Sequence, residues 1–413
     1  MPEPTSQIPQ HCPSPRELDD LELLVNGGLA PRTGYDAAGP ITLALPDEVA
    51  VQTAAAGAVE LVDPEGLALA RVANDGTVTS LAPHEAGAFR RLHLSPGQVH
   101  EAYDGALSVP VAGPLTDVDL TMVGERRDGR TVLLLALTGA GTPQGVTPVG
   151  LLRASLAAAD LLGDTQVVAV PLASHGDPDV DHQLGQQVVA NYAPGDVLAV
   201  TGTGDLPDQI DDLVASDQPG PDEQGLVIFL TGLSGSGKST LARALHDLLL
   251  EDGRRTVTSL DGDVVRRNLS AGLTFSKADR ETNIRRIGWV AAEISRHRGI
   301  AICSPIAPFE ETRQQVRDYV EQAGGAFFLV HVATPLEECE RRDKKGLYAK
   351  ARRGEIAEFT GISSPYDEPR EPAVRVDTTG RTVEDVLGEV LDALADAGHL
   401  HLTGEPVEQQ RIY

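Results

Sequence analysis

A glycine-rich motif in the second half of the chain limits the possible folds more than any other feature of the sequence. It matches the pattern G-x-x-x-x-G-K-[ST], which is met by Gly232, Leu233, Ser234, Gly235, Ser236, Gly237, Lys238, Ser239 and Thr240. An apolar run at 225–231 precedes it and a leucine-rich run at 238–250 follows it. The motif therefore lies between an expected buried strand and an expected helix, which favours a phosphate-binding loop over a chance glycine- and serine-rich turn.

Each position of this motif has a chemical reason. Glycines allow successive backbone N–H groups to converge on phosphate oxygens, and the start of the following helix adds its positive dipole end. Lys238 is expected to reach the β- and γ-phosphates of ATP, and the Ser239 hydroxyl to bind Mg²⁺. We expect all nine residues to bind ATP, with Lys238 as a catalytic residue and Ser239 as the metal ligand.

The remainder of the second half alternates between apolar runs and amphipathic stretches. Strands are expected at 256–260, 300–303, 326–332 and 374–377, and helices at 278–297, 311–322 and 383–397. Alternation of this kind predicts an α/β fold, with a doubly wound parallel sheet and helices on both of its faces.

Two carboxylates follow the expected strand at 256–260. Asp261 and Asp263 would then lie at the carboxyl end of a parallel strand, where open α/β sheets bind ligands. Such a pair can hold Mg²⁺ and orient or deprotonate an attacking hydroxyl, so we take both as catalytic candidates rather than as a plain Asp-Gly turn. The short domain, about 190 residues, favours a small-molecule kinase over a motor or a switch GTPase.

Basic residues gather downstream, where an anionic acceptor would need them. Arginines occur at positions 266, 267, 280, 285 and 286, and a second basic run covers 341–353. The second run also contains glycine, which is typical of a lid that closes over the transferred phosphate and excludes water.

Charge is spread unevenly along the 413 residues. The whole chain carries a net charge of −27, and residues 1–224 hold 9 basic and 32 acidic side chains, a net −23, without a single lysine. A surface this acidic repels nucleic acid, so no nucleic-acid partner is expected.

Neither a membrane span nor a secretory leader is expected. No apolar run approaches the roughly 18–20 residues that a membrane span requires, and residues 1–17 lack a charged-then-apolar pattern. Three scattered cysteines, Cys12, Cys303 and Cys339, are too few for a disulfide framework or a zinc site. These features predict a cytoplasmic protein.

The first half reads as two smaller regions joined to the second half by a linker. A helix at 16–26 and short strands at 41–45, 59–62, 68–72 and 77–81 predict a β-rich module over 1–115. Strands at 131–137, 166–170 and 197–201 and a helix at 148–162 predict a small α/β region over 116–214. The Pro-, Gly- and acid-rich stretch 215–224 is expected to be the linker to a domain at 225–413.

In order along the chain, several segments of the second half resemble the adenylylsulfate (APS) kinase family. They are GLSGSGKST, LDGD at 260–263, GLTFSKADRETNIRRIG at 272–288, PIAPF at 305–309 and RRDKKGLYAKARRGEIAEFTGISSPYDEP at 341–369. The resemblance covers about 225–400. It implies transfer of phosphate from MgATP to the 3′-hydroxyl of APS, which gives PAPS and ADP.

The resemblance also implies a set of substrate-binding residues. By position these are Arg266, Phe275, Arg280, Asn283, Ile306, Ala307, Lys345, Leu347 and Phe359. Arginines would pair with phosphate and sulfate oxygens, and the two phenylalanines would enclose the adenine. Asp263 is expected to orient the 3′-hydroxyl.

One position departs from the family pattern. Many stand-alone members have Ile-Ser-Pro-[FY], and the serine has been proposed as a phosphorylated intermediate, whereas this chain has Ile306, Ala307, Pro308 and Phe309. Ala307 has no hydroxyl, so direct transfer from ATP to APS is the simpler mechanism. Ser304 is close by, but no feature of the sequence nominates it as a substitute.

The first half resembles ATP sulfurylase in degraded form. Residues 14–35 are similar to the opening helix and turn of that family, residues 36–115 to its PUA-like module, and residues 171–200 to a segment after its active site. The signatures Q-x-R-N-P-x-H-x-x-H and G-R-D-H are absent. Histidines at 11, 84, 93, 100, 175 and 182 show no H-x-x-H spacing and are expected to be surface or core residues.

These features together predict an APS kinase with a catalytically inactive scaffold as its first half. We expect a homodimer, and the scaffold could dock a separate ATP sulfurylase. Three alternatives stay open: a first half that senses APS or PAPS, a bifunctional PAPS synthetase, and a P-loop kinase acting on another small hydroxyl compound.

Overall fold

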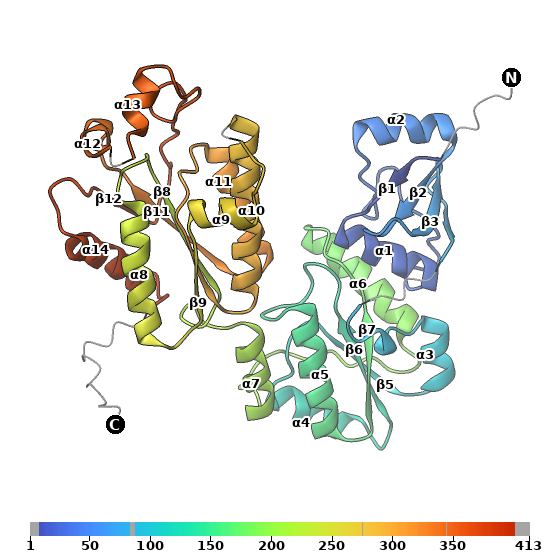
Figure 1. The fold of residues 1–413 in the computed structure, drawn as a ribbon. Coiled ribbons are helices and arrows are strands. Elements are labelled where there is room, and N and C mark those ends of the chain that lie inside the picture. Colours follow the sequence, from blue (N-terminus) through green and yellow to red (C-terminus); the bar gives the residue numbers. More distant parts are fainter. Residues whose placement is uncertain (1–7, 83–86, 275, 344, 401–413) are drawn as a thin grey trace, which may run out of the picture. The chain divides into compact units, whose positions relative to one another are not determined.

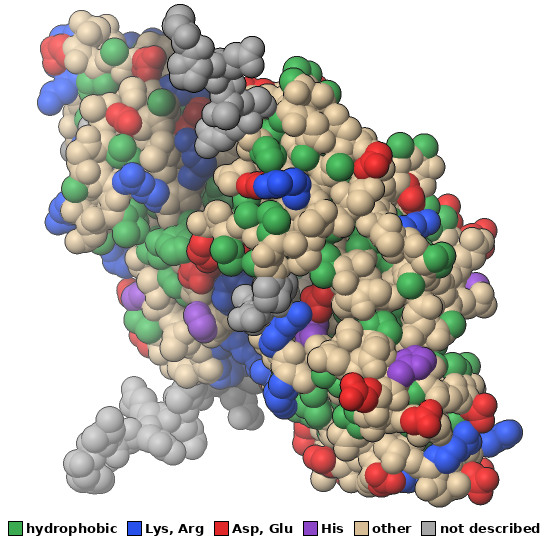
Figure 2. Space-filling view, turned by 90° about the vertical axis from the view of Figure 1, so that its right-hand side faces the viewer, with side chains coloured by type: hydrophobic (Ala, Val, Ile, Leu, Met, Phe, Trp, Pro, Cys, Tyr) green, Lys and Arg blue, Asp and Glu red, His purple; other side chains and the backbone are tan. Residues whose placement is uncertain are grey.

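The computed structural model describes residues 8–82, 87–274, 276–343 and 345–400, with the side chain of Asp263 also outside the description. It divides into two compact units, residues 1–218 and 219–413, which are described separately below. Within the described residues, no helix is long and apolar enough to cross a membrane. Acidic and basic side chains are interspersed with hydrophobic ones on the face drawn in Figure 2.

Unit 1 begins with a four-stranded sheet in the order β1-β2-β3-β4. Its strands are β1 (Gln10–His11), β2 (Ala58–Val62), β3 (Ala68–Ala73) and β4 (Val78–Ser80), and its helices are α1 (Pro15–Asn26) and α2 (Asp47–Ala56). Helix α1 starts where its residues dictate: Ser14 and Glu17 form a reciprocal capping box, and Pro15 occupies the first turn.

A three-stranded parallel sheet, in the order β5-β6-β7, forms the rest of unit 1. Its strands are β5 (Leu107–Val111), β6 (Val132–Leu137) and β7 (Thr165–Val170). Its helices are α3 (Pro96–Ala102), α4 (Asp117–Arg126), α5 (Pro148–Leu162), α6 (Pro178–Tyr192) and α7 (Asp208–Asp217), after the 3₁₀ turn η1 (Arg90–Leu92). One apolar core joins α1 and the first sheet to Leu133, Leu135 and Val168 of the second, so the two sheets of unit 1 share a core.

Two strands expected in unit 1 are absent. Residues 41–45 run without a strand partner, although Ile41 is buried and contributes to the core. Residues 197–201 form only an isolated bridge, between Val197 and Ser108. At 197–201, the Thr201 N–H donates a hydrogen bond to the carboxylate of Asp119 at 3.0 Å. This bond takes the place of a backbone hydrogen bond to a neighbouring strand.

The five-stranded parallel sheet of unit 2 confirms the predicted doubly wound α/β fold. Its order is β12-β11-β8-β10-β9, made from β8 (Leu226–Thr231), β9 (Val257–Leu260), β10 (Ile300–Cys303), β11 (Ala326–Val332) and β12 (Val374–Val376). Every residue of β8 is buried, as a central strand covered on both faces requires.

Helices cover both faces of this sheet (Figure 1). Helices α8 (Lys238–Asp252) and α14 (Val383–Asp396) pack on one face, and α10 (Lys277–Arg296) and α11 (Glu310–Gln322) on the other. Three short helices complete the unit: α9 (Gly262–Asn268), α12 (Leu336–Arg342) and α13 (Leu347–Arg352). Figure 1 shows α12 and α13 together at one end of the sheet, which is the end that carries the site described next.

Candidate active site

The glycine-rich loop connects β8 to α8, which is the strand–loop–helix context its sequence requires. Gly232 has φ +149°, and a Cβ there would lie 2.4 Å from the carbonyl oxygen of Val332. Gly237 caps α8 with φ +104°, and a Cβ there would lie 3.2 Å from the methyl group of Thr378. Both positions therefore need glycine. At Gly232 a side chain would clash with the backbone, and at Gly237 the left-handed backbone conformation is the main reason.

The Lys238 side chain folds back over this loop. Its Nζ donates hydrogen bonds to the carbonyl oxygens of Gly232, at 2.9 Å, and Leu233, at 2.7 Å, and the residue is only 6% exposed. Burial lowers the pKa of the ammonium to about 8, against a partly compensating effect of the nearby Asp261 charge. A phosphate group would offer the ammonium anionic acceptors in place of neutral ones, which favours its charged form.

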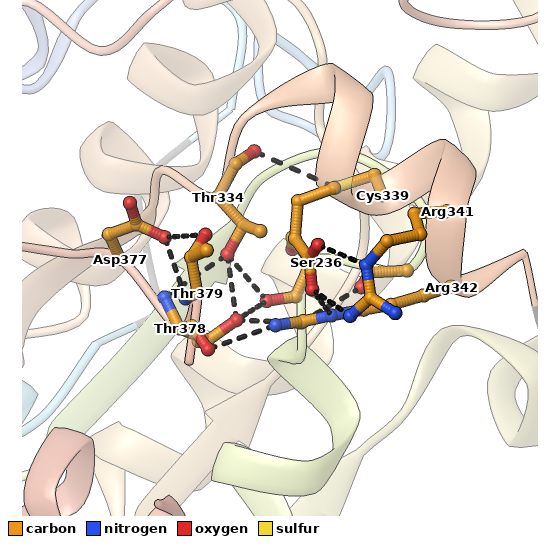
Figure 3. Close-up of polar contacts among 10 residues, drawn as sticks. Ser236, Thr334, Cys339, Arg341, Arg342, Asp377, Thr378 and Thr379 are labelled. Atoms are coloured by element: carbon orange, nitrogen blue, oxygen red, sulfur yellow. Dashed lines mark hydrogen bonds and ion pairs between the residues drawn. The ribbon is translucent and has the colours of Figure 1, made fainter. Parts of the chain in front are cut away.

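Side chains behind the loop hold its carbonyl groups. Figure 3 shows Thr334, Thr378 and Arg342 gathered around Ser236. The hydroxyls of Thr334 and Thr378 each donate to the Ser236 carbonyl oxygen at 3.0 Å, and Arg342 donates to the Thr378 hydroxyl at 2.7 Å. In addition, the Tyr348 hydroxyl donates to the Ser234 carbonyl oxygen at 2.8 Å.

This anchoring fixes the direction of the amide groups. In a planar trans peptide, a carbonyl and the following N–H point in opposite directions. With the Ser234 and Ser236 carbonyls held from behind, the N–H groups of Gly235 and Gly237 face the opposite side of the loop. The arrangement is suited to binding phosphate oxygens. No local pattern in the sequence points to Thr334, Thr378 or Tyr348, because their contacts join segments about 100 or more residues apart.

The two candidate residues, Asp261 and Asp263, follow the end of β9. The Asp261 carbonyl oxygen accepts N–H bonds from Val264 and Val265 at the start of α9, and its carboxylate accepts a hydrogen bond from the Ser304 hydroxyl at 3.2 Å. Asp263 stands in α9, but its side chain lies outside the described residues. The Asp261 charge acts on Lys238, which puts the two groups within electrostatic reach.

The oxygen donors present fit a magnesium ion bound mainly through phosphate and water. Ser239 is exposed in the first turn of α8, and Asp261 supplies a carboxylate. Across the residues that the structure describes, no cluster of three or more His, Cys, Asp or Glu could hold a metal ion by itself. Mg²⁺ in nucleotide sites usually takes only one or two protein ligands beside the phosphates, so this donor set is sufficient.

Arg280 joins α10 to residues 358–364, which follow the basic run 341–353 that was expected to be a lid. Its guanidinium donates to the Glu358 carbonyl oxygen at 2.9 Å, the Thr360 hydroxyl at 3.0 Å and the Ser364 hydroxyl at 3.3 Å. The neighbouring Asn283 is 4% exposed, and its Oδ1 has no hydrogen-bond partner among the described residues. A buried amide oxygen without a partner is costly, and a ligand N–H or O–H could satisfy it.

A pocket of about 510 Å³ lies between the glycine-rich loop and this segment. It is lined by Leu233, Gly361, Ile362, Ser363, Ser364, Pro365, Tyr366 and Glu368. Phe359, just before it, packs edge-on against Tyr348 with ring centres 5.0 Å apart. Among the other expected substrate residues, Arg266 donates a hydrogen bond to the Thr274 carbonyl oxygen at 3.2 Å. Lys345 is exposed, and Leu347 is the first residue of α13. Phe275 lies outside the described residues.

Ala307, which was expected to bind the substrate, lies in an apolar environment. Its side chain is fully buried and belongs to the apolar core beneath α10 and α11, and its backbone has φ +44°. Arg313, itself 2% exposed, holds the Ala307 carbonyl oxygen at 2.8 Å, and the Thr231 hydroxyl donates to the carbonyl of Ile306 at 2.6 Å. The whole of Ala307 is therefore buried, whereas Ile306 is half-buried.

At the corresponding edge of the β5-β6-β7 sheet, unit 1 has no comparable loop. A Cβ on Gly139, after β6, would lie 2.1 Å from the carbonyl carbon of Leu172, so the chain itself fills the space. The Asp19 carboxylate accepts the Ala140 N–H at 2.7 Å, and burial raises the pKa of Asp19 to about 7. This edge offers little room and an acidic group where a phosphate would need cations.

Three described histidines of unit 1 have polar partners within the unit. His175 is paired with Asp20 at 3.2 Å in a nearly buried contact, and that hydrogen bond raises the pKa of His175. His93 contacts Glu22 at 3.0 Å, and His100 contacts the Asn191 carbonyl oxygen at 3.0 Å. His84 lies outside the described residues.

The parallel sheet and the glycine-rich loop of unit 2 define a P-loop domain. The family model for adenylylsulphate kinase matches residues 224–377. Residues 224–377 of this chain therefore belong to the APS kinase family.

Solved and curated relatives extend this result. The chain is similar to a hexameric APS kinase from Thiobacillus denitrificans, with a TM-score of 0.70 and 26% identity over 96% of this chain and 94% of that one. It is 53% identical over 175 residues to a sulfate adenylyltransferase of Neosartorya fischeri, which is 42% of this chain and 30% of the relative. A Gibberella zeae sulfate adenylyltransferase is 45% identical over 188 residues, 46% of this chain and 33% of the relative. The chain spans about a third of the length of these curated relatives.

Proposed function

We propose that the protein is an adenylylsulfate kinase, which transfers the γ-phosphoryl group of MgATP to the 3′-hydroxyl of APS and yields PAPS and ADP. The observation that carries this proposal is the coincidence of the family match over 224–377 with an intact phosphate-binding loop. In the transfer, a bond forms between the 3′-oxygen and the γ-phosphorus, and the bond from that phosphorus to the bridging oxygen of ADP breaks.

The binding of ATP follows from the glycine-rich loop, Gly232 to Thr240. Amides of the loop bind the phosphates, and Lys238 moves from the loop carbonyls to the β- and γ-phosphate oxygens. Ser239 and Asp261 are the residues that would hold Mg²⁺, which supplies positive charge against the developing negative charge on the leaving ADP. Asp263 orients the attacking 3′-hydroxyl and accepts its proton.

APS would bind on the other side of the loop. Arg266, Arg280 and Lys345 provide cations for its phosphate and sulfate, and Asn283 offers its unpartnered amide oxygen. Phe275 and Phe359 enclose the adenine. The rest of the proposed APS site is formed by Leu347 and the backbone of Ile306 and Ala307. Because Arg280 bonds to three groups in 358–364, APS binding exchanges some of these bonds for ligand oxygens and so couples binding to lid movement.

Direct transfer is the proposed route. Ala307 has no hydroxyl to phosphorylate, and its side chain is buried in the apolar core. A phosphorylated intermediate at this position is therefore not required. Incubation with MgATP alone should leave the protein unphosphorylated, as intact-mass measurement would detect. A stable phosphate on the chain that is then passed to APS would contradict direct transfer.

For the first half, residues 1–214, we propose a catalytically inactive scaffold made of a PUA-like module (1–115) and a degenerate sulfurylase-like region (116–214). The filled sheet edge at Gly139 and the half-buried Asp19 support it. A bifunctional PAPS synthetase is the second candidate, and the names of the curated relatives favour it. The absence of the histidine signatures from the sequence speaks against it.

Nucleotide stoichiometry separates the scaffold from a nucleotide sensor. Titration of the full chain with a non-hydrolysable ATP analogue, APS and PAPS should give sites that all depend on the second half. Substitution Lys238→Ala should then remove analogue binding. A saturable site for APS or PAPS that persists after Arg280→Ala and Phe359→Ala would support a sensor in the first half.

Assembly and location belong to the same proposal. We propose a closed homo-oligomer, a homodimer or a multiple of it, because the Thiobacillus denitrificans relative is hexameric. Light scattering at micromolar concentration would give the number of chains directly. Docking of a separate ATP sulfurylase is proposed as a role for the scaffold, and a reducing cytoplasm agrees with the three free cysteines.

The experiment that tests the proposed activity follows the product. Full-length protein with MgATP and APS should release ADP and phosphorylate the ribose 3′-position, which phosphorus NMR or mass spectrometry can assign. Replacement of APS by AMP, which lacks the sulfate, should lower turnover at low substrate concentration. ADP release that does not depend on APS, or a phosphate on another position, would overturn the assignment.

A further inference from the structure

Ser304 lies next to one of the carboxylates of the site. Strands β9 and β10 are paired in register, with Leu260 opposite Cys303, so Asp261 and Ser304 are the next residues along each strand. The Ser304 Oγ donates a hydrogen bond to Oδ2 of Asp261 at 3.2 Å, and Ser304 is 6% exposed. The pairing of two parallel strands thus brings a hydroxyl donor to a carboxylate at the ligand-binding edge of the sheet.

Asp261 is connected to the reacting centre through the phosphate-binding loop. Its negative charge acts on Lys238, whose Nζ donates hydrogen bonds to the carbonyl oxygens of Gly232 and Leu233. Its main-chain carbonyl also starts α9, which carries Asp263. A change in the direction of the Asp261 carboxylate would therefore alter the field at the lysine.

We propose that Ser304 is a positioning residue, whose hydroxyl fixes one oxygen of Asp261 and so sets the direction of this carboxylate during phosphoryl transfer. The inference rests on the proposed kinase activity. A carboxylate on a short side chain rotates freely about two bonds, and one hydrogen bond from a buried donor removes much of that freedom. Catalysis by positioning is sensitive to such small displacements.

The hydroxyl, rather than the volume of the side chain, is what the proposal requires. In Ser304→Ala we expect kcat to fall about tenfold, with KM for ATP and for APS changed less than about twofold. Ser304→Thr and Ser304→Val form a matched pair, because the two side chains have nearly the same shape and only threonine keeps the hydroxyl. Threonine should be at least about fivefold faster than valine, even if the alanine variant folds poorly.

A double-variant cycle separates positioning from a structural role. Once Asp261→Asn has removed the carboxylate, adding Ser304→Ala should cost almost nothing further in transfer of labelled phosphate. The control is Ser295→Ala, another buried serine of unit 2, whose hydroxyl bonds only to the Ala292 carbonyl oxygen and which should keep full activity.

The outcomes distinguish this inference from the proposed function. An active wild-type chain in which Ser304→Ala keeps its kcat, or in which the losses of the two substitutions multiply, would overturn the positioning role and leave the kinase assignment intact. A wild-type chain without APS-dependent ADP release would overturn the kinase assignment, and the catalytic role of Ser304 with it. Equal rates for the threonine and valine variants would likewise contradict the proposal.

Discussion

The carboxyl edges of two parallel sheets in this chain carry opposite chemistry. In unit 2, the edge at β8 continues into a loop that needs glycine at Gly232 and Gly237 and that carries a buried lysine. In unit 1, the edge at β6 continues into Gly139, where the chain fills the space, and the half-buried Asp19 carboxylate accepts the N–H of Ala140. An open sheet edge is a place for a ligand, but backbone donors, cations and free volume decide whether one binds.

The largest expected effect follows from removing the cation from the unit 2 edge. Lys238→Ala should lower kcat by about a thousandfold, because no other group described in the loop supplies an ammonium to the β- and γ-phosphates. ADP release with MgATP and APS measures it. Arg243→Ala, an exposed cation on the same helix α8, is the control and should keep wild-type activity. Substantial turnover in the Lys238 variant would mean that the lysine does not act on the transferred phosphate.

Removal of the Phe359 ring should have an intermediate effect on the kinetics. Phe359→Ala is expected to raise KM for APS about tenfold and to leave kcat nearly unchanged, since stacking on a base is worth roughly 1–3 kcal/mol. Steady-state kinetics with APS as the variable substrate check this. Trp289→Ala removes an aromatic side chain that is 59% exposed on α10 and serves as the matched control. Unchanged kinetics in the Phe359 variant would count against an adenine clamp.

A smaller effect is expected from strain in the loop. Gly237→Ala forces alanine to φ +104°, next to the methyl group of Thr378 at 3.2 Å, which should weaken ATP binding up to about tenfold. Calorimetric titration with a non-hydrolysable ATP analogue gives the affinity. The control is Gly388→Ala in α14, where a Cβ would meet nothing within 4 Å. Equal affinities in wild type and the Gly237 variant would show that the loop tolerates a side chain.

The acidic edge of unit 1 should respond to pH. Asp19 has a raised pKa of about 7 in the folded chain, so the folded state holds a proton that the unfolded state has already lost above pH 4. His175 has a raised pKa through its bond to Asp20, so its contribution is full at low pH and is lost as pH rises through that pKa. Asp19 therefore makes the folded state less stable as pH rises from about 4 to about 7, and His175 does so as pH rises above its ordinary pKa.

Substitution tests this pH dependence in the full chain. Asp19→Asn should flatten the loss of melting temperature between pH 4 and pH 7, because the amide can still accept the Ala140 N–H without a charge. The gain in stability should be close to zero at pH 4 and should grow by about 1 kcal/mol per pH unit up to pH 7. A variant that is destabilised equally at both pH values would mean that Asp19 is ionised throughout.

Local patterns explain which parts of the molecule could be predicted from sequence. The parallel sheet of unit 2 and the loop between β8 and α8 follow from apolar runs and glycines that are adjacent in the chain. Helix α5 also follows, since Pro148–Leu162 has a threonine cap and continuous helical periodicity. Helix α2 was missed because its alanine-rich face has no apolar periodicity, although Asp47, Glu48 and the left-handed Gly57 mark its ends.

The supporting contacts of the site could not be predicted, because they join distant parts of the chain. Arg313 reaches Asp367, 54 residues away, and Tyr366 reaches Thr231, 135 residues away. The Ser304–Asp261 contact depends on the register between β9 and β10, which a single sequence does not specify. Residue types and the loop motif indicated the chemistry of the site, whereas its geometry comes from the packing of the sheet.

One paired assay on the full-length protein tests the contrast between the two edges most directly. ADP release is measured with MgATP and APS, and pyrophosphate release is measured in parallel with MgATP and sulfate in the presence of pyrophosphatase. We expect APS-dependent ADP release without sulfate-dependent pyrophosphate release, and we expect Lys238→Ala to abolish the ADP release. Sulfate-dependent pyrophosphate release that survives in Lys238→Ala would contradict it, because unit 1 would then be an active sulfurylase.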